Sequence, residues 1–435
     1  MSIQKITALV FTAILVAPII GASTLTMGPE QTISAEDYDQ WKPNIAYNSL
    51  HQEYLVVWHD VSPIFGRAIM GQRVDLEGNT LAEFTIAYED TPPRDNARAS
   101  VAYDPDDDVY LVVWSRDYFG DDSDWDIYGR IIPWDGPSPS QTQFSITGAT
   151  RKQWHPRIAY GGAQGEFMVT WWTEGSGGVH SFCSAQRVAP AGTLIGSDIT
   201  LPFSATEERV GPDIAYNQAR NEYLVVYQRM DDAGGNIYGV RLTGTGSVIG
   251  GDHFGIAAWP DPETMPRVSA SRVADEWAIV WQSDVPGLMK DIYARRMWVD
   301  GAGTHQFSTP VLVDSSDLDE RYPDISAFPE NTEYLISWEG QYSNTSGPFG
   351  IFARTLNTTN SLGPTFNPRI NYSGEPGDYT SPAVAASPTG WLVAWEHDRN
   401  DTPTYQDIHA RAVYGPLFTD GFETGDLSVW DAHSP

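Results

Sequence analysis

Residues 53–58 read EYLVVW, and six variants of this stretch recur along the 435-residue chain. They are VYLVVW at 109–114, EFMVTW at 166–171, EYLVVY at 222–227, EWAIVW at 276–281, EYLISW at 333–338 and GWLVAW at 390–395. The closing aromatic residues follow one another at intervals of 54 to 57 positions. Because each stretch is rich in β-branched and aromatic residues, each is expected to form a strand. The regular spacing predicts seven structural repeats.

Three further strand-like segments keep the same period. One precedes each copy and is usually marked by a proline two residues before its centre. Its centres are Ile45, Val101, Ile158, Ile214, Val268, Ile325 and Val384. A third segment of the type DIYGR follows each copy and begins at Ile69, Ile127, Cys183, Ile237, Ile292, Ile351 and Ile408. The fourth is centred on Ile33, Ile86, Ile146, Ile199, Ile256, Val313 and Ile370. Each repeat is therefore predicted to hold four short strands.

The order of the segments predicts a closed ring rather than a linear solenoid. A fourth-type segment at residues 31–34 precedes the first repeat, whereas the last repeat ends after its third segment near Val413. In a ring the N-terminal strand would complete the last sheet and leave no free edge. We therefore predict an all-β, seven-bladed β-propeller of four-stranded antiparallel blades over residues 23–415, with its strands in 31–413. The N-terminal strand is expected to complete blade 7.

The two ends of the chain fall outside this domain. Residues 1–22 are expected to be a signal peptide, because Lys5 is followed by an apolar run at 8–20 and by small residues. We therefore expect a secreted, extracellular or periplasmic protein that is associated with the cell surface if the tail anchors it. The apolar run is too short to span a membrane comfortably, and no later segment qualifies. Residues 416–435 form a separate C-terminal tail.

Charge and cysteine content restrict the partners and the stabilising chemistry. The chain has 57 acidic and 26 basic residues, for a net charge of −31. Such a surface repels nucleic acid, and it disfavours other polyanions unless arginines cluster locally. The single cysteine, Cys183, occupies the position of Ile69 and Ile127 in the repeat, so it is expected to be a small buried residue rather than a nucleophile. A monomer held together by its own core is expected.

Parts of the repeat resemble a known group of proteins. The segments IAYNSLHQEYLVVW at 45–58, SVAYDPDDDVYLVVW at 100–114 and DIYGR at 126–130 resemble the repeats of secreted bacterial seven-bladed β-propellers, and loosely those of TolB-type propellers. The tail FTDGFETGDLSVWDAHSP at 418–435 resembles a DGFExGxxSxW ending of secreted bacterial proteins. The resemblance implies the fold. It implies no single activity, because propellers include enzymes, binding proteins and scaffolds.

The loops that enter the first strand and those that join the second and third strands are expected to share one face of the ring, around its central channel. Aromatic and acidic residues gather in these loops, which suits a carbohydrate, because sugar faces stack on rings and hydroxyl groups bind carboxylates. The candidate ligand-binding residues are Trp41, Trp154, Trp172, His59, Asp60, Glu174, Glu339 and Glu396. The favoured interpretation is a non-catalytic propeller that binds a glycan or an extracellular protein on this face.

Two other interpretations stay open, an extracellular enzyme and a structural protein. Paired carboxylates would suit a glycoside hydrolase, whereas a histidine, a tyrosine and an arginine would suit a polysaccharide lyase that removes a proton beside a uronate carboxylate. The candidates for that lyase are His155, His397, Tyr322, Tyr379, Arg98 and Arg321. A structural surface protein with a docking tail is the third interpretation.

A calcium site is the one cofactor site that the sequence suggests. Asp122, Asp124 and Asp126 place three carboxylates at alternate positions, and calcium prefers several oxygen ligands in a loop. However, Ile127 stands where a helical calcium loop needs glycine, and Asp126 also begins a predicted strand. The alternatives are therefore calcium at this loop or no cofactor.

Overall fold

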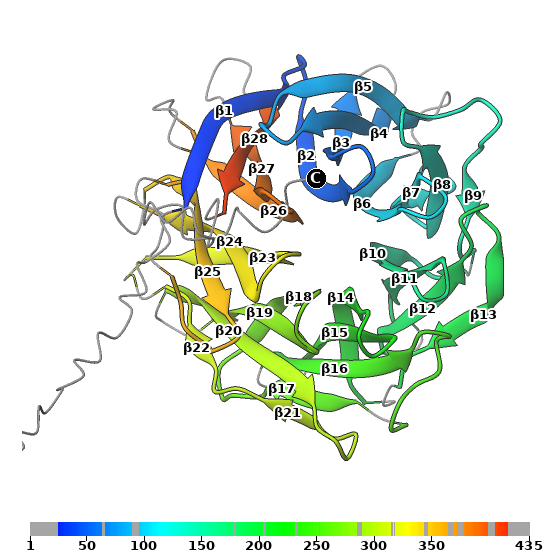
Figure 1. Cartoon of the computed structure of the whole chain (residues 1–435). Helices are drawn as coiled ribbons and strands as arrows, with labels where there is room; N and C mark the ends of the chain where they lie inside the picture. Colours follow the sequence, from blue (N-terminus) through cyan, green and yellow to red (C-terminus); the bar gives the residue numbers. More distant parts are fainter. Residues whose placement is uncertain are drawn as a thin grey trace, which may run out of the picture.

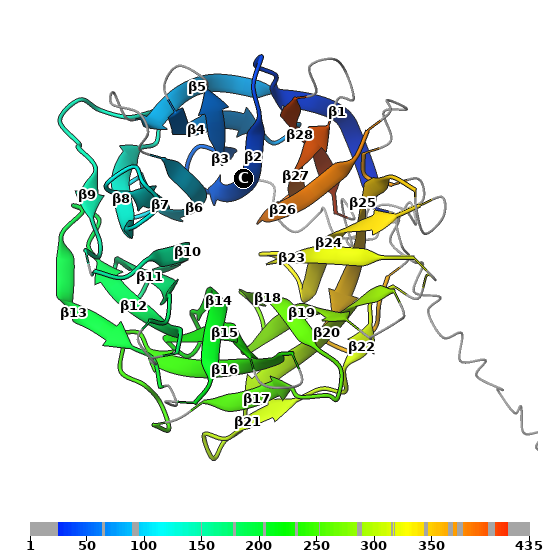
Figure 2. The same ribbon diagram turned by 180° about the vertical axis from the view of Figure 1, so that it is seen from behind.

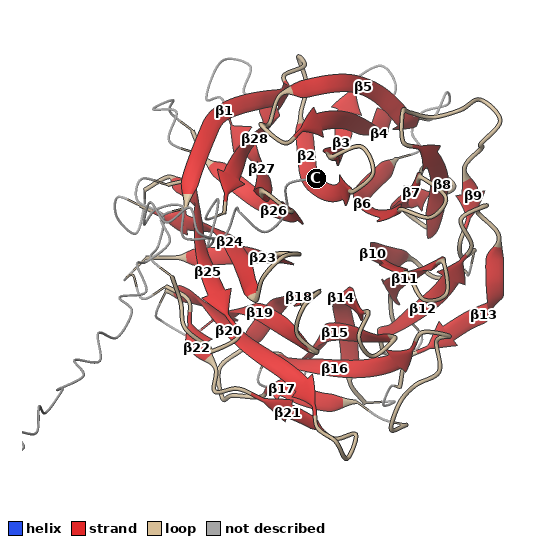
Figure 3. Cartoon of the chain, viewed as in Figure 1, coloured by secondary structure: helices blue, strands red, loops and turns tan. Residues whose placement is uncertain are grey.

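Each copy of the EYLVVW stretch forms the second strand of an antiparallel sheet, and seven such sheets surround a central channel (Figure 1). The computed structural model describes residues 25–62, 66–88, 95–148, 150–176, 180–202, 206–230, 234–251, 253–284, 289–314, 316, 318–342, 347–363, 369–371, 377–398 and 405–415. The view from behind shows the same ring of sheets (Figure 2). These residues contain strands and no α-helix (Figure 3), and hence no helix that could cross a membrane. The expected signal peptide and the tail from 416 lie outside them.

Within each blade the strands run from the channel outward in chain order. The innermost strands are β2 (Gln40–Asn48), β6 (Asn96–Asp104), β10 (Gln153–Gly161), β14 (Glu208–Asn217), β18 (Glu263–Ala270), β23 (Glu320–Ala327) and β26 (Tyr379–Ser387). The second strands are β3 (Glu53–Ser62), β7 (Val109–Asp117), β11 (Glu166–Thr173), β15 (Glu222–Met230), β19 (Glu276–Asp284), β24 (Glu333–Gln341) and β27 (Gly390–Asp398). The third strands are β4 (Gly66–Asp75), β8 (Trp125–Pro133), β12 (Phe182–Val188), β16 (Asn236–Thr243), β20 (Lys290–Val299), β25 (Phe349–Asn357) and β28 (Gln406–Tyr414).

The outer strands vary most. They are β5 (Thr80–Ala87), β9 (Phe144–Ser145), β13 (Leu194–Thr200), β17 (Phe254–Ala257) and, in blade 5, the separate pieces β21 (His305–Phe307) and β22 (Val311–Leu312). In blade 6 the described part of the outer segment is reduced to a Leu356–Leu362 bridge and a hydrogen bond from the Ile370 N–H to the Ile351 carbonyl, at 2.9 Å. The predicted four-stranded plan is confirmed, with its outer strand interrupted in these two blades.

The ring closes where the sequence predicted. Strand β1 (Thr26–Ser34) pairs antiparallel with β28 of blade 7, with Gln31 opposite Ala410 and Thr26 opposite Tyr414. The N-terminal strand therefore completes the last blade (Figure 1), and it begins five residues earlier than the predicted 31–34 segment. Because the strand fills the outer position of blade 7, it covers the edge of β28 and gives this blade its fourth strand.

The second strands form the centre of the core, because every blade lies between two others. Leu55, Val56, Val57 and Trp58 of β3 are all fully buried, so both faces of the strand are covered. The closing aromatic residues are at most 1% exposed, as expected for packing between blades: Trp58, Trp114, Trp171, Tyr227, Trp281, Trp338 and Trp395. Cys183 is buried as predicted, and burial raises the pKa of its thiol, so it is not a reactive thiolate.

A repeated arginine ties neighbouring blades together. In four blades the third residue after the DIYGR isoleucine is an arginine that donates to a carbonyl in the outer segment of the preceding blade. The pairs are Arg130 to Ile86, Arg295 to Ile256, Arg354 to Val313 and Arg411 to Ile370, at 2.5–2.6 Å. Ile86 and Ile256 lie at register shifts of β5 and β17, and Val313 and Ile370 lie in the interrupted outer segments. These hydrogen bonds therefore satisfy carbonyl groups where the pairing of the outer segment is irregular.

The closing strand supplies a test of the fold. Ile33 is 3% exposed and packs in one cluster with Trp58 and Ile408, whereas its neighbour Thr32 is exposed. We expect Ile33→Ala to lower the free energy of unfolding by about 2–5 kcal/mol, as deletion of buried methyl groups usually does. Thr32→Ala is the matched control and should change it by less than about 0.5 kcal/mol. Urea titration followed by tryptophan fluorescence measures both, and equal effects would contradict this account of the closure.

Candidate functional site

The first strand of every blade contains the same irregularity. In β2 the pairing jumps from Trp41–His59 to Asn44–Val57, so Lys42 and Pro43 together lie opposite the closing aromatic Trp58. Two residues opposite one is a β-bulge. The first residue of each bulge has a φ between 47° and 59°, and in six blades a proline follows it. These residues are Lys42, Arg98, His155, Gly211, Met265, Tyr322 and Ser381.

This backbone conformation is costly, and neighbouring blades hold it in place. A residue other than glycine at positive φ costs roughly 1 kcal/mol or more, yet six of the seven have a side chain. In four of them the backbone N–H donates to the side chain that follows the closing aromatic of the preceding blade. The pairs are Lys42 to Glu396 at 2.7 Å, Ser381 to Glu339 at 3.0 Å, Tyr322 to Gln282 at 3.4 Å and Arg98 to the His59 Nδ1 at 3.5 Å.

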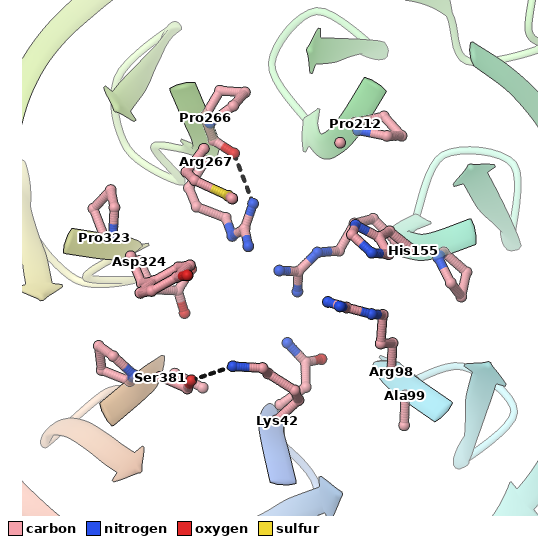
Figure 4. Close-up of a pocket in the computed structure, with 18 of the residues that line it drawn as sticks. Lys42, Arg98, Ala99, His155, Pro212, Pro266, Arg267, Pro323, Asp324 and Ser381 are labelled. Atoms are coloured by element: carbon pink, nitrogen blue, oxygen red, sulfur yellow. Dashed lines mark hydrogen bonds between the residues drawn. The ribbon is translucent and has the colours of Figure 1, made fainter. Parts of the chain in front are cut away.

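The bulges direct one residue of each blade into the channel. All seven line a single cavity of about 530 Å³ on the axis of the ring. Figure 4 looks down this cavity and shows side chains from different blades converging on it. Behind the bulges the next residues also contribute, and Asn44, Arg157, Arg267 and Asp324 complete most of the polar lining.

Polar side chains that follow the bulges also join neighbouring blades. Asn44, Asp213 and Asp324 each accept a hydrogen bond from a backbone N–H in the following blade, at 2.8–3.0 Å. Their side chains are therefore tied to the wall through one oxygen. Lining the cavity and joining the blades are thus functions of the same short segment.

Positive charge dominates the lining. Among the described residues, Lys42, Arg98, Arg157 and Arg267 face one carboxylate, that of Asp324. Burial, followed by repulsion from Arg157, lowers the pKa of Arg98, and the same causes lower the pKa of Arg267 to about 10. Burial raises the pKa of Asp324 to about 6, against the opposing effect of Arg267.

The candidates for lyase chemistry divide into two groups. His155, Tyr322 and Arg98 line the cavity together. Burial, followed by the charges of Arg98 and Arg157, holds the pKa of His155 well below its usual range, so its ring is neutral at pH 7. The ring also meets Trp172 edge-on, with centroids 6.0 Å apart.

The second group lies in the wall of the ring. His397 and Tyr379 are both about 1% exposed and stack on each other at 4.2 Å. Arg321 pairs with Asp319 at 2.8 Å and lies over the Phe349 ring. None of these three lines the cavity.

Of the candidate ligand-binding residues, Trp172 lines the cavity, and three others support it from behind. His59, Glu339 and Glu396 are at most 4% exposed, and each accepts the backbone N–H of a bulge residue in the next blade. Burial, followed by positive charges nearby, lowers the pKa of His59 to about 3, so its ring is the neutral form that can accept. Burial raises the pKa of Glu339 to about 7.

The other four ligand-binding candidates lie away from the cavity. Trp41 meets the His59 ring edge-on at 5.6 Å, and Trp154 stacks on Trp125 at 4.6 Å. Glu174 is exposed just beyond the end of β11. Asp60 is 5% exposed, and one of its carboxylate oxygens has no hydrogen-bond partner among the described residues.

The suggested calcium loop is not assembled as a metal site. The described residues hold no group of three or more acidic, histidine or cysteine side chains arranged around a common point. Asp122 accepts from the Trp125 indole N–H at 2.6 Å and pairs with Lys152 at 3.3 Å, whereas Asp126 is buried in β8.

Sequence reasoning missed much of the lining. It did not select Lys42, Met265, Ser381, Arg157, Arg267 or Asp324. The signal was present, because a proline two residues before each strand centre was visible in six repeats. A proline inside a regular strand would remove a ladder hydrogen bond, so its recurrence indicates a bulge, and the residues on either side of it are the ones that face the channel.

Comparison with known proteins relates the chain to solved structures only. No family model matches, and no curated protein sequence matches. The chain is similar to a protein of unknown function from Dyadobacter fermentans, with 14% identity, 74% of this chain and 94% of that chain covered, and a TM-score of 0.51. It is also similar to an α-L-arabinanase from Penicillium chrysogenum (12% identity, 76% and 98% covered, TM-score 0.52) and to an α-L-arabinofuranosidase from Fusarium graminearum (10%, 77% and 98%, 0.50). At these identities the likeness shows the propeller fold.

Asp60 supplies a test of the electrostatics in the wall of the ring. Burial, followed by the charges of Glu36 and Glu83, raises the pKa of Asp60 to about 7, so the folded protein keeps a proton there that the unfolded chain loses near pH 4. This proton stabilises the fold at low pH, and the contribution is lost as pH rises from about 4 to about 7. We expect Asp60→Asn to reduce the fall in unfolding free energy between pH 5 and pH 8, measured by urea titration. Asp107→Asn at an exposed turn is the control, and an equal change there would refute the assignment.

Proposed function

We propose that the protein is an exported propeller that binds a carbohydrate in the channel cavity. The main support for this proposal is that the Trp172 ring, the Tyr322 phenol and several hydrogen-bond donors line one cavity of about 530 Å³. Pockets of this size suit small ligands, and a few well-placed polar groups around an aromatic surface give them orientation and specificity. The first strands of the blades hold Tyr322 and the cations, and β11 holds Trp172, so these groups lie on strands rather than on loops.

The fold neighbours give this proposal additional support. The Penicillium chrysogenum arabinanase was solved with arabinobiose, and the Fusarium graminearum arabinofuranosidase was solved with an iminosugar inhibitor. Proteins of similar architecture therefore accommodate saccharides. The residues above, rather than this likeness, are the basis for placing the ligand in the channel.

The cavity suits binding better than glycoside hydrolysis, because hydrolysis of this type requires two carboxylates. A glycoside hydrolase of that type needs two carboxyl groups about 5–9.5 Å apart across the scissile bond. In the described part of the chain, Asp324 is the one carboxylate that lines the cavity, and one of its oxygens already accepts the Val384 N–H. Glu339 and Glu396 hold bulge backbones instead.

Lyase activity is the second candidate function, because His155, Tyr322 and Arg98 share the cavity. A neutral imidazole could accept the proton beside a uronate carboxylate while Arg98 neutralises that carboxylate, and the Tyr322 phenol could protonate the departing glycosidic oxygen. The sugar C–H bond and the glycosidic C–O bond break, and a carbon–carbon double bond forms. This step needs no cofactor.

Trp172 tests the binding proposal. We expect Trp172→Ala to weaken binding of the best oligosaccharide on a glycan array by about tenfold or more, since buried aromatic residues commonly supply more than 1 kcal/mol of binding free energy. Trp134 stacks on His51 at the opposite end of the blades, so Trp134→Ala is the matched control. Calorimetry with the selected oligosaccharide measures both. Equal affinities for the two variants would exclude the cavity as the binding site.

The lyase alternative has a direct assay. Incubation with uronate-containing polysaccharides should produce unsaturated ends that absorb in the ultraviolet, and His155→Ala should abolish this signal while the protein stays folded. His397→Ala is informative as a comparison, because His397 lies in the wall. Binding without any unsaturated product would leave the non-catalytic function and exclude the lyase.

The exported location is part of the same proposal. It depends on residues 1–22 acting as a signal peptide, and the tail from residue 416 could retain the protein at the surface. Fractionation of cells that express the full chain and a chain without residues 418–435 tests both points. Recovery of both forms entirely inside the cell would exclude export, and equal amounts of the two forms at the cell surface would exclude retention by the tail.

A further inference from the structure

We infer that the carbohydrate is acidic, and that the cavity holds its carboxylate or sulfate group against the Arg98 guanidinium. This inference rests on the proposed carbohydrate function, because it specifies the ligand of the same site. It concerns the charge of the ligand and applies to binding and to catalysis alike.

Arg98 lacks the partners that the third-strand arginines described above have. Four of those arginines pair with a glutamate at the start of the second strand: Arg73 with Glu53, Arg187 with Glu166, Arg241 with Glu222 and Arg296 with Glu276, at 2.6–2.8 Å. Four others, one of them beside Arg296 in β20, donate to carbonyl groups of the preceding blade. No carboxylate in the described part of the chain lies within 4 Å of the Arg98 guanidinium, although the chain has 57 acidic residues against 26 basic ones. The Arg98 side chain is exposed to the channel, so an anion that enters the cavity can reach its guanidinium.

Three more cations approach the same space. Arg267 donates to the carbonyl of its neighbour Pro266 at 2.8 Å, and no ion pair to a described carboxylate involves it. Arg157 meets Asp213 at 3.8 Å, and Lys42 meets Glu396 at 3.5 Å. Figure 4 shows Arg98 and Arg267 extending into the channel from different blades.

Most carboxylates near the cavity lie in its wall, and Asp324 is the one described carboxylate that lines it. Asp213 and Asp324 accept backbone N–H groups of the next blade, and Glu396 accepts the backbone N–H of Lys42 and forms an ion pair with its ammonium group at 3.5 Å. Burial, followed by repulsion from Arg157, lowers the pKa of Arg98 and Arg267 as described. An anion at the centre would relieve this repulsion and would be held by charge-assisted hydrogen bonds.

The blade 4 sector of the cavity leaves room for the sugar ring. A Cβ atom built on Gly211 would have no neighbour within 4 Å, so the blade 4 sector of the channel is open. Met265 in the next blade is 38% exposed and offers an apolar surface, and Trp172 lies on the other side. A ligand with an anionic group at Arg98 and its ring toward Gly211 fits this arrangement.

The planar guanidinium fork matches a carboxylate or a sulfate, so both sources need separate tests. The first pair of probes is oligogalacturonate and its fully methyl-esterified form, which has the same backbone without charge. The second pair is a sulfated galactan oligosaccharide and the unsulfated oligosaccharide. Inorganic sulfate alone serves as a probe of the anion seat without carbohydrate. Calorimetry with the full propeller measures each affinity.

The variants are Arg98→Gln, Arg98→Lys and Arg220→Gln. Arg220 lies in the turn between β14 and β15, at the opposite end of the blade, and pairs with Asp275 of the next blade. Arg220→Gln therefore removes the same charge far from the cavity. We expect Arg98→Gln to weaken binding of the acidic oligosaccharide by about tenfold or more, as loss of a charge-assisted hydrogen bond would. Arg98→Lys should retain part of the affinity, and Arg220→Gln should retain all of it.

Each outcome is informative. Preference for the acidic member of either pair, lost in Arg98→Gln, supports the inference and identifies the anionic group. If the neutral oligosaccharides bind equally well, carbohydrate binding stands and the anion seat is refuted. If sulfate alone binds through Arg98 and no oligosaccharide does, the seat stands and the carbohydrate function fails. Absence of all binding refutes both.

Discussion

The left-handed residue at the bulge of each first strand is the constraint on which both the ring and its cavity depend. A bulge turns one side chain per blade toward the axis, and the same distortion places a backbone N–H where the preceding blade can hold it. Glu396, Glu339, Gln282 and His59 supply that acceptor in four of the seven junctions. Because the junctions and the lining share these residues, the shape of the cavity follows from the way the blades pack. The site is therefore rigid in the same sense that the core is rigid.

Much of the fold could be predicted from the sequence, because its physical causes repeat. Strands that are apolar on both faces must lie between two neighbours, and the displaced fourth segment at residue 33 has a partner only if the chain closes on β28. The interrupted outer strands of blades 5 and 6 could not be predicted, since they depend on local loop geometry. For the site, Arg98, His155, Tyr322 and Trp172 were within reach because they lie next to the repeated strands. The role of Glu339 and Glu396 was not, because their partner is the backbone of another blade, which no sequence pattern displays.

The net charge of the whole chain and the charge of the channel lining have opposite signs. The chain as a whole carries −31, whereas the lining of the channel presents four cations and one carboxylate in its described part. At physiological ionic strength, charges separated by more than about 8 Å are largely screened. The channel therefore acts on a ligand that has already entered, while the outer surface repels large polyanions before they arrive. This combination favours a short acidic ligand, or the end of a chain, over the middle of a long polymer.

The pairing of β1 with β28 also determines when folding of the ring can be completed. The Arg411 Nε to Gly28 carbonyl hydrogen bond joins residues that are 383 positions apart. The first strand to be synthesised must therefore wait for the last one before either edge is covered. Contacts between such distant residues form slowly, because their loop-closure entropy is lost before any stabilisation is gained. During that interval the edge of β28 offers the same hydrogen-bonding groups to the β1 strand of a second molecule. At high concentration a fraction of refolding chains is thus expected to exchange this strand and form a domain-swapped dimer.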